Sequence, residues 1–326
     1  MTARSALFSH LNGADATRKL RQMHIRHGEV TMEMGRREFI KITAAGAAGG
    51  LAMLRGKNAS GAARRLHNPK GLRINMLPSG LSMAEGFKLA RECGFTQMEP
   101  FATFDARLVR ETKAAADAAK IHIGSVANPM NWKYPLSSGD PAVAAEGFKA
   151  QSAALENAQA WGADAILMIP GVVKPDVSYE EAWVRSRKQI EGLLPLAEKL
   201  GVAIAMEEVC DQSKFLLSPR DYIQYLDSFK SRSVRAYFDT GNVMPVGYPQ
   251  DWIHELGHRI VKVHLKDWDP KTRKFVDLGD GAVDWVAVRQ AFIDVGYTGT
   301  FTAELRRGDA AYLKDISGRI DRLVLS

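Results

Sequence analysis

Four apolar runs in the second half of the sequence end on side chains that commonly bind metal ions. They are VAIAMEEV with Glu207 and Glu208, YFDTGN with Asp239, KVHLKD with His264, and FTAEL with Glu304. If these runs are neighbouring parallel strands, three carboxylates and one imidazole meet at one edge of the sheet, where unshielded like charges repel each other. A divalent cation removes this conflict. A ligand set rich in carboxylates favours Mn²⁺, with Mg²⁺, Co²⁺ or Zn²⁺ as alternatives.

Each of these residues also has an ordinary structural explanation when it is considered alone. Asp239 is of a type that caps helices and forms turns after strands. A single histidine such as His264 is often a hydrogen-bonded core residue, and Glu304 has Arg306 and Arg307 nearby as ion-pair partners. Four compatible ligand types at the ends of four successive runs favour one shared metal site over these separate explanations.

The elements that must position these residues alternate between apolar runs and stretches of helical period from residue 72 onward. Ser82 with Glu85 and Ser178 with Glu181 have the spacing of capping boxes, which mark helix starts. We expect eight strands, at residues 72–77, 96–101, 121–127, 165–170, 202–208, 235–239, 260–266 and 300–305. Eight strand–helix units predict an α/β fold, a single-domain (β/α)8 TIM barrel over residues 66–326. The alternative, a doubly wound open sheet, would need a Gly-rich phosphate loop after the first strand, which INMLPSGLS lacks.

From about residue 72 to its end, the sequence resembles the xylose-isomerase-like TIM barrel superfamily, and within it the sugar phosphate isomerase/epimerase family. The motifs that carry the resemblance are AMEEV, FLLSP at 215–219, YFDTGN, IVKVHLKDWD and GDGAVDWVAV…GYTGTFTAEL. Similarity to ketose 3-epimerases implies one metal ion held by Glu207, Asp239, His264 and Glu304. It also implies that Glu207 and Glu304 are the catalytic acid/base pair. No cofactor besides the metal is expected.

The sequence departs from this family pattern at two positions. Asn242 stands where many ketose epimerases have a histidine that touches the substrate, and Glu208 stands where relatives commonly have asparagine. Side chains alternate in direction along a strand, so Glu207 and Glu208 cannot both face the metal. We expect Glu208 to point toward the surrounding helices or the rim, where it meets a lysine or arginine.

The implied metal ion and the implied pair of glutamates support one reaction intermediate, an enediolate, which can react further in several ways. A metal that chelates a carbonyl and its neighbouring hydroxyl stabilises the enediolate formed when a carboxylate removes a proton. Return of the proton to the opposite face inverts the centre, and return to the adjacent carbon interconverts aldose and ketose. We therefore expect a metal-dependent sugar isomerase or epimerase. One alternative is a 3-keto-glycoside lyase or hydratase that acts by β-elimination on the same site, and another is an exported sugar-binding barrel without catalysis.

Four further residues are expected to contact a carbohydrate substrate at the mouth of the barrel. Asn242 and Lys266 lie near the predicted metal, Glu99 ends the second strand, and Trp132 lies in the loop NPMNWKYP. The Trp132 ring is suited to stack on a sugar face, or simply to pack the loop. Glu99 is equally suited to a buried salt bridge, and Lys266 to an ion pair with Asp267 on the rim.

An N-terminal segment, GRREFIKITAAGAAGGLAML at residues 35–54, resembles a twin-arginine export signal. Its arginine pair precedes about thirteen small and apolar residues, too few to span a bilayer comfortably. We expect export to the periplasm by the twin-arginine translocation machinery, with processing near residues 59–63 and no stable membrane anchor afterwards. The alternatives are an anchor helix or a chance arginine pair.

The position of this segment also predicts how the N-terminal region is divided. Export signals begin close to the chain start, so Met32 or Met34 is the expected initiator. Residues 1–31 are then a non-native or disordered extension, and residues 32–65 are the signal and processing segment. Because phosphorylated sugars are mostly cytoplasmic, an exported enzyme favours a non-phosphorylated sugar or sugar derivative as the substrate.

The charge distribution and the cysteines exclude two further classes. Residues 1–65 hold 12 Lys and Arg against 4 Asp and Glu, whereas residues 66–326 hold 32 against 33. The predicted barrel therefore lacks the basic surface that nucleic acid requires, which disfavours a role like that of the apurinic endonucleases of the same barrel superfamily. Cys93 and Cys210 are the two cysteines of the chain, and no disulfide framework is expected. The sequence is also compatible with a homo-oligomer.

Overall fold

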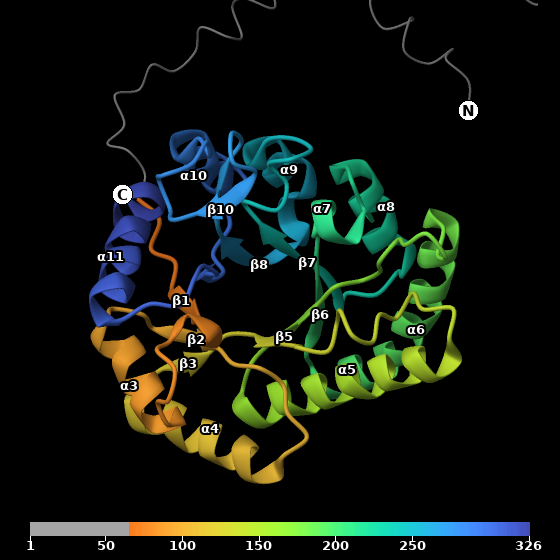
Figure 1. Ribbon diagram of the computed structural model, residues 1–326, viewed down its shortest axis with the longest axis horizontal. Coiled ribbons are helices and arrows are strands. Elements are labelled where there is room, and N and C mark those ends of the chain that lie inside the picture. The colour runs from red at the N-terminus through yellow and green to blue at the C-terminus, as the bar shows by residue number, and fades with distance from the viewer. Residues whose placement is uncertain (1–64) are drawn as a thin grey trace, which may run out of the picture. The chain divides into compact units, whose positions relative to one another are not determined.

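Residues 65–326, which the computed structural model describes, form one α/β barrel. Parallel strands surround the barrel axis, and the helices lie outside them (Figure 1). All eight predicted strand positions carry strand structure, which confirms the single-domain TIM barrel. The twin-arginine segment, the processing region and residues 1–31 lie outside the described residues.

The sheet follows the order β3-β2-β1-β11-β8-β7-β6-β5-β4. Each pair of neighbouring strands in it is parallel. In chain order the strands are β1 (Lys70–Arg73), β2 (Gln97–Glu99), β3 (His122–Ile123), β4 (Val126–Ala127), β5 (Ala165–Met168), β6 (Ala203–Glu207), β7 (Val234–Asp239), β8 (Ile260–Leu265) and β11 (Phe301–Ala303). Because β6, β7, β8 and β11 are consecutive in the sheet, the four runs that carry the predicted ligands end side by side.

The predicted strand 121–127 is divided into β3 and β4 by a bulge. His122 N–H donates to the Thr96 carbonyl and Gly124 N–H to the Met98 carbonyl, but the next bond, to the Pro100 carbonyl, comes from Ala127. A regular parallel ladder would use residue 126, so one extra residue is inserted at this point. The bulge turns Ser125 into the barrel, and the bridge between Phe101 and Ala127 continues the sheet beyond it.

Eight principal helices cover the outside of the barrel within the described residues. They are α3 (Met83–Glu92), α4 (Ala106–Ala119), α5 (Pro141–Trp161), α6 (Tyr179–Leu200), α8 (Pro219–Ser228), α9 (Pro249–Leu256), α10 (Trp285–Asp294) and α11 (Ala310–Ile320). Short helical turns lie at η1 (Ile74–Met76), α7 (Cys210–Ser213), η2 (Gly257–Arg259) and η3 (Asp321–Leu325). Both predicted capping boxes are present: Ser82 with Glu85 starts α3, and Ser178 with Glu181 starts α6. Each box satisfies the first amides of its helix.

An antiparallel hairpin that the sequence did not predict follows β8. Its strands are β9 (Asp267–Asp269) and β10 (Lys274–Val276). The buried Asp267 carboxylate holds the hairpin and the loop behind it, because it accepts hydrogen bonds from the amides of Trp268, Gly279 and Val283 and from the Trp285 indole. A buried carboxylate with four donors is fully satisfied without a cation. The hairpin is therefore a fixed part of the barrel mouth.

The alternation of side chains along the strands decides which residues face the barrel interior. Ala205 of β6 and Tyr237 of β7 belong to a small apolar cluster inside the barrel, whereas Met206 belongs to the larger core shared with the helices. Glu207 and Asp239 each follow an interior residue by two positions, so they face the interior as well. Among residues 65–326, no helix is both long and apolar enough to cross a membrane.

Candidate metal centre

The structure brings together the four side chains that the sequence predicts as metal ligands. Glu207, Asp239, His264 and Glu304 each offer one ligand atom, and these atoms all lie within 4.8 Å of one another. Glu207 and Asp239 end β6 and β7, His264 lies one residue before the end of β8, and Glu304 follows β11 directly. Asp239 and His264 are partners in the sheet register, which places their side chains at the same level.

Asp239 uses its two carboxylate oxygens differently. Oδ1 accepts hydrogen bonds from the amides of Gly241 and Asn242, at 2.8 and 2.9 Å, and thereby forms the turn after β7. Oδ2 is buried, accepts no hydrogen bond among the described residues, and faces the cluster. An aspartate at this position therefore shapes its own loop and still presents one oxygen to the centre.

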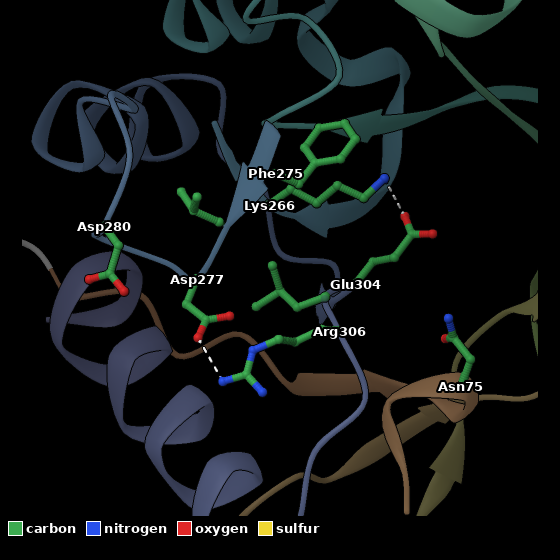
Figure 2. Close-up of a pocket in the computed structure, with 9 residues that line it drawn as sticks. Asn75, Lys266, Phe275, Asp277, Asp280, Glu304 and Arg306 are labelled. Atoms are coloured by element: carbon green, nitrogen blue, oxygen red, sulfur yellow. Dashed lines mark hydrogen bonds and ion pairs between the residues drawn. The ribbon is translucent and has the colours of Figure 1, made fainter. Parts of the chain in front are cut away.

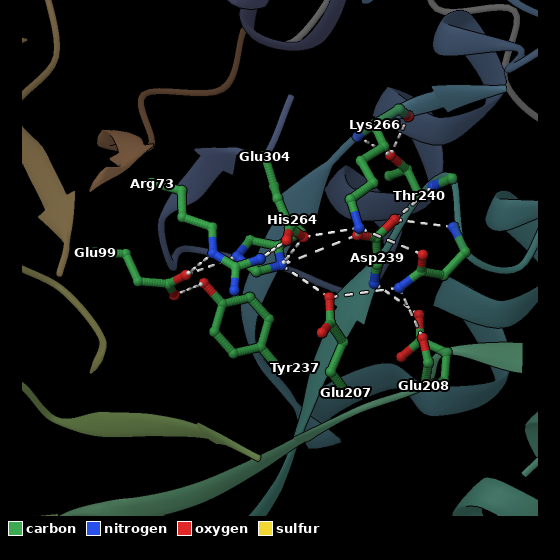
Figure 3. A network of polar contacts seen from close by, with 12 residues as sticks. Arg73, Glu99, Glu207, Glu208, Tyr237, Asp239, Thr240, His264, Lys266 and Glu304 are labelled. Atoms are coloured by element: carbon green, nitrogen blue, oxygen red, sulfur yellow. Dashed lines mark hydrogen bonds and ion pairs between the residues drawn. The ribbon is translucent and has the colours of Figure 1, made fainter. Parts of the chain in front are cut away.

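The His264 ring connects two groups of carboxylates (Figure 3). Its Nδ1 lies 2.8 Å from Glu207 Oε1 and 2.8 Å from Glu304 Oε2, and its Nε2 lies 3.0 Å from Glu99 Oε1. The other oxygen of Glu99 accepts hydrogen bonds from the Ser125 and Tyr237 hydroxyls, both at 2.6 Å. The interior face of the barrel therefore holds the imidazole from behind, with Nδ1 directed at the cluster.

Two cations neutralise part of the negative charge of the cluster. Lys266 Nζ lies 2.9 Å from Asp239 Oδ2 and 2.8 Å from Glu304 Oε2. The Arg73 guanidinium contacts Glu304 and lies 3.5 Å from Glu99, with the Phe101 ring on one side of it. Because all these groups are largely buried, their charges interact more strongly than they would at the surface.

The donor set and its burial fit a hard divalent cation. Three carboxylate oxygens and one imidazole nitrogen match the preference of Mn²⁺ or Mg²⁺ for oxygen-rich sites. Asp239 Oδ2 and Glu304 Oε2 are buried and accept no hydrogen bond from a described residue, although the Lys266 ammonium is close to both. Buried carboxylate oxygens without hydrogen bonds are costly unless a cation compensates them.

The electrostatic environment shifts the pKa values of the acidic groups of the site in different directions. Burial tends to raise the pKa of Glu207, but the neighbouring His264, with further help from Lys266 and Arg73, lowers it overall. Glu99 behaves in the same way: despite burial, His264 and Arg73 lower its pKa to about 2. Burial and the Glu207 charge outweigh Lys266 at Asp239 and raise its pKa. Glu207 is therefore ionised near neutral pH and able to accept a proton.

A pocket of about 300 Å³ opens directly onto this centre. Glu207 and Glu304 line it, together with three of the predicted substrate contacts, Asn242, Lys266 and Trp132. We call this cavity the reaction pocket. Asn242 Nδ2 donates to the Glu208 carbonyl at 2.9 Å and lies 3.4 Å from Glu207 Oε1, while Trp132 is 42% exposed at the pocket wall. Their contact with a substrate stays a prediction that this placement supports.

Glu99, the fourth predicted substrate contact, lies elsewhere. Its side chain is completely buried, pairs with His264 and Arg73, and is not among the residues that line the reaction pocket. This geometry favours the alternative of a buried salt-bridge partner. We expect Glu99 to affect function indirectly, by orienting the His264 ring.

Arg73 and Asn128 also line the reaction pocket, and neither was singled out from the sequence. Arg73 ends β1, and Asn128 follows β4 directly. Asn128 is 4% exposed and its Nδ2 has no hydrogen-bond partner among residues 65–326, so a donor faces a cavity without an acceptor. A census of all eight predicted strand ends would have found Asn128, directly after the run 121–127, but not Arg73, which lies inside the predicted run 72–77.

Glu208 differs from its sequence-based expectation. It points away from the cluster, as alternation predicts, but within the described residues no lysine or arginine pairs with it. Its Oε1 accepts a hydrogen bond from the Asp239 amide at 2.7 Å, and its Oε2 is buried with no hydrogen-bond partner among residues 65–326. Burial, with the charges of Asp239 and Glu207, raises the pKa of Glu208 well above its usual value. The side chain therefore holds the end of β7 against β6 through a hydrogen bond.

We expect Glu208→Gln to stabilise the metal-free protein in a pH-dependent manner. Because the folded-state pKa of Glu208 is raised, ionisation opposes folding at every pH above the unfolded-state value of 4.5. Each pKa unit between the two values corresponds to about 1.4 kcal/mol. Urea unfolding should therefore show no gain over wild type at pH 4 and a growing gain from pH 5 to pH 8. The exposed Glu156→Gln serves as control, and an equal gain at pH 4 would contradict the assignment.

Comparisons with known proteins agree with this architecture. The family model described as "Xylose isomerase-like TIM barrel" matches residues 87–321. L-ribulose-5-phosphate 3-epimerase from Salmonella typhi is 29% identical over 251 residues, which cover 73% of this chain and 87% of the relative.

Two solved structures share the fold. The E. coli 3-keto-D-glucoside 4-epimerase superposes with a TM-score of 0.67 at 16% identity, covering 78% of this chain and 99% of the other. An L-ribulose 3-epimerase superposes with a TM-score of 0.68 at 17% identity, covering 79% and 94%. Because the family model covers most of the barrel and the strand order agrees with it, the chain belongs to the xylose isomerase-like TIM barrel family.

Proposed function

We propose that this protein is a divalent-metal-dependent isomerase that epimerises or isomerises a non-phosphorylated sugar or sugar derivative. One observation carries the proposal: Glu207 and Glu304 approach the same nitrogen of His264, each at 2.8 Å, and both line the reaction pocket. Two carboxylates on either side of one substrate carbon are what proton removal and return require. The names of the relatives, which are sugar epimerases, support the same reaction class.

The residues of the site have the following roles in the proposed reaction. One glutamate of the pair removes the proton next to the substrate carbonyl, and the other delivers a proton to the opposite face or to the neighbouring carbon. Arg73 beside Glu304 and Asn242 beside Glu207 hold the two carboxylates in place. A divalent cation bound by Glu207, Asp239, His264 and Glu304 supplies Lewis-acid stabilisation of the negative charge that develops on the substrate oxygens. We propose Mn²⁺ as this cation, with Mg²⁺, Co²⁺ and Zn²⁺ as the alternatives to compare.

The N-terminal segment supports a proposal about the compartment in which this chemistry takes place. Residues 35–54 resemble a twin-arginine signal, so we propose that the barrel works in the periplasm. Fractionation of cells that express the full chain, compared with a variant carrying Arg36→Lys and Arg37→Lys, tests this point. Loss of the periplasmic form in the variant is expected, and an unchanged distribution would overturn the proposed export.

Hydrogen exchange tests the proposed reaction directly. The protein loaded with Mn²⁺ is incubated in D₂O with D-fructose and with 3-keto-glucosides, and the sugars are analysed by mass spectrometry and NMR. We expect deuterium on the carbon next to the carbonyl of an otherwise intact sugar. Release of the aglycone would instead indicate the β-elimination alternative on the same site. Absence of exchange with every sugar, despite bound metal, would contradict both enzymatic proposals and leave a sugar-binding barrel.

A further inference from the structure

A second and larger pocket lies beside the reaction pocket. Its volume is about 630 Å³, and it lies among the residues that follow β1, β10 and β11 (Figure 2). Asn75, Phe275, Asp277, Asp280, Leu305 and Arg306 contribute to its wall. We call this cavity the extension pocket. No step of the proposed reaction uses it.

The two pockets meet at one ion pair. Lys266 and Glu304 line both of them, and the Lys266 ammonium lies 2.8 Å from Glu304 Oε2. Glu207 lines the reaction pocket and not the extension pocket, so the carbon that reacts between Glu207 and Glu304 must lie in the reaction pocket. If one substrate occupies both pockets, the group in the extension pocket is attached to the reacting sugar. The link between the two parts then passes Glu304 and Lys266.

The charges of the extension pocket disfavour a phosphate. Its two cations are already paired, Lys266 with Glu304, and Arg306 with Asp277 at 3.3 Å. Asp280 also lines the wall, and its carboxylate pairs with Arg319 at 2.8 Å. Binding a phosphate here would require breaking these pairs and placing like charges next to each other.

The polar atoms of the wall instead match a group that carries hydroxyls. Asp277 accepts from the Tyr312 hydroxyl and pairs with Arg306, and Asp280 pairs with Arg319. Each carboxylate still has lone pairs that accept further hydrogen bonds, and neither donates one. Asn75 Oδ1 is a buried acceptor with no hydrogen-bond partner among the described residues. A hydroxyl from a ligand would satisfy this atom, because each hydroxyl supplies one donor.

Phe275 gives the same pocket an apolar face that is held in place. Its side chain is 40% exposed, its ring centre lies 5.1 Å from that of Trp268, and the Lys266 ammonium lies 4.8 Å from it. Gly241 leaves room for the ring, since a Cβ there would lie 3.2 Å from it. The hairpin that carries Phe275 is fixed by Asp267, so the ring is a preorganised platform.

From this combination we propose that the extension pocket binds an uncharged sugar unit joined to the reacting sugar, which makes the natural substrate a disaccharide or a similar glycoside. The inference rests on the proposed function and specifies its substrate class. The C–H face of the second sugar packs on Phe275, and its hydroxyls donate to Asn75, Asp277 and Asp280. Binding energy from this remote unit then contributes to holding the reacting carbon between the two glutamates.

The test compares substrates that differ by one glucosyl unit. Deuterium exchange by the protein loaded with Mn²⁺ is measured on D-fructose against isomaltulose and maltulose, and on 3-keto-glucose against 3-keto-trehalose. We expect kcat/KM to be at least about tenfold higher for one of the glucosylated sugars than for its monosaccharide, a difference of ~1.4 kcal/mol. Phe275→Ala should remove most of this preference and leave exchange on the monosaccharide within about twofold of wild type. Phe275→Tyr, which keeps the ring, should retain the preference.

Phe104→Ala is the matched control. Phe104 is 59% exposed and has a lysine ammonium 5.5 Å from its ring, as Phe275 has, but it lines neither pocket. Its substitution should leave both rates unchanged. Equal kcat/KM for the monosaccharides and the glucosylated sugars, or equal losses on both in Phe275→Ala, would overturn the extension pocket while the proposed function stands. Absence of exchange on all five sugars would overturn the proposed function and this inference together.

Discussion

Glu304→Gln should lower the rate of deuterium exchange by a factor of about 10²–10⁴, the range that a positioned acid or base contributes. The amide keeps the size of the side chain but can neither remove nor return a proton. It also takes one negative charge from a centre where Arg73 and Lys266 already contact this residue. We therefore expect weaker Mn²⁺ binding as well, which isothermal titration calorimetry measures independently of activity.

The control for this prediction is Asp211→Asn. Asp211 is an exposed carboxylate in α7, after β6, and it pairs weakly with Arg273 at 3.7 Å. Its substitution should leave both exchange and Mn²⁺ affinity unchanged. If Glu304→Gln retained wild-type exchange, the assignment of Glu304 to the acid/base pair would be wrong.

His264→Ala should lower the free energy of unfolding by about 3–5 kcal/mol, the cost of removing one partner from a buried ion pair. The imidazole is fully buried between Glu99 and Glu207, and without it both carboxylates lose a hydrogen-bond partner. Urea unfolding of the metal-free protein measures this loss. The same variant should fail to bind Mn²⁺ at concentrations that saturate the wild type, because three carboxylates remain without their nitrogen ligand.

His122→Ala is the matched histidine control, because His122 is exposed on β3. It should change neither the free energy of unfolding nor the Mn²⁺ affinity. Unfolding of His264→Ala with the wild-type free energy, together with unchanged Mn²⁺ binding, would show that the ring does not hold this centre together.

The strand ends of the site were predictable because simple rules determine them. Parallel strands of a barrel end on one face, so Glu207, Asp239, His264 and Glu304 had to approach one another once their runs were assigned to neighbouring strands. A second simple rule, the alternation of side chains along a strand, places Glu207 and Glu208 on opposite faces of β6. These rules need only residue order and side-chain periodicity, which the sequence contains.

The surroundings of these residues were less predictable because they depend on distant contacts. The bulge at Ser125 adds one residue to a run that reads as continuous strand, and Gly124 inside this run is only a weak local signal for it. Asp267 resembles a rim residue in sequence, yet it is completely buried by four donors from residues 268–285. Glu208 was expected to find a cation, but the Asp239 amide is its partner. For Asp267 and Glu208, the hydrogen-bond donors that determine the position of the side chain come largely from other segments of the chain.

The contacts of Glu99 have a consequence for the protonation of His264. Glu99 Oε2 already receives the Ser125 and Tyr237 hydroxyls, which leaves Oε1 as the acceptor that faces His264 Nε2. Burial tends to lower the pKa of His264, but Glu99 and Glu207 raise it overall, which favours an imidazolium that donates to both carboxylates. A divalent cation bound by Nδ1 would replace the proton on that nitrogen and leave the other proton on Nε2, beside Glu99. One extra backbone residue beside Ser125 thus helps hold the Nε2 proton of a histidine on the opposite part of the sheet.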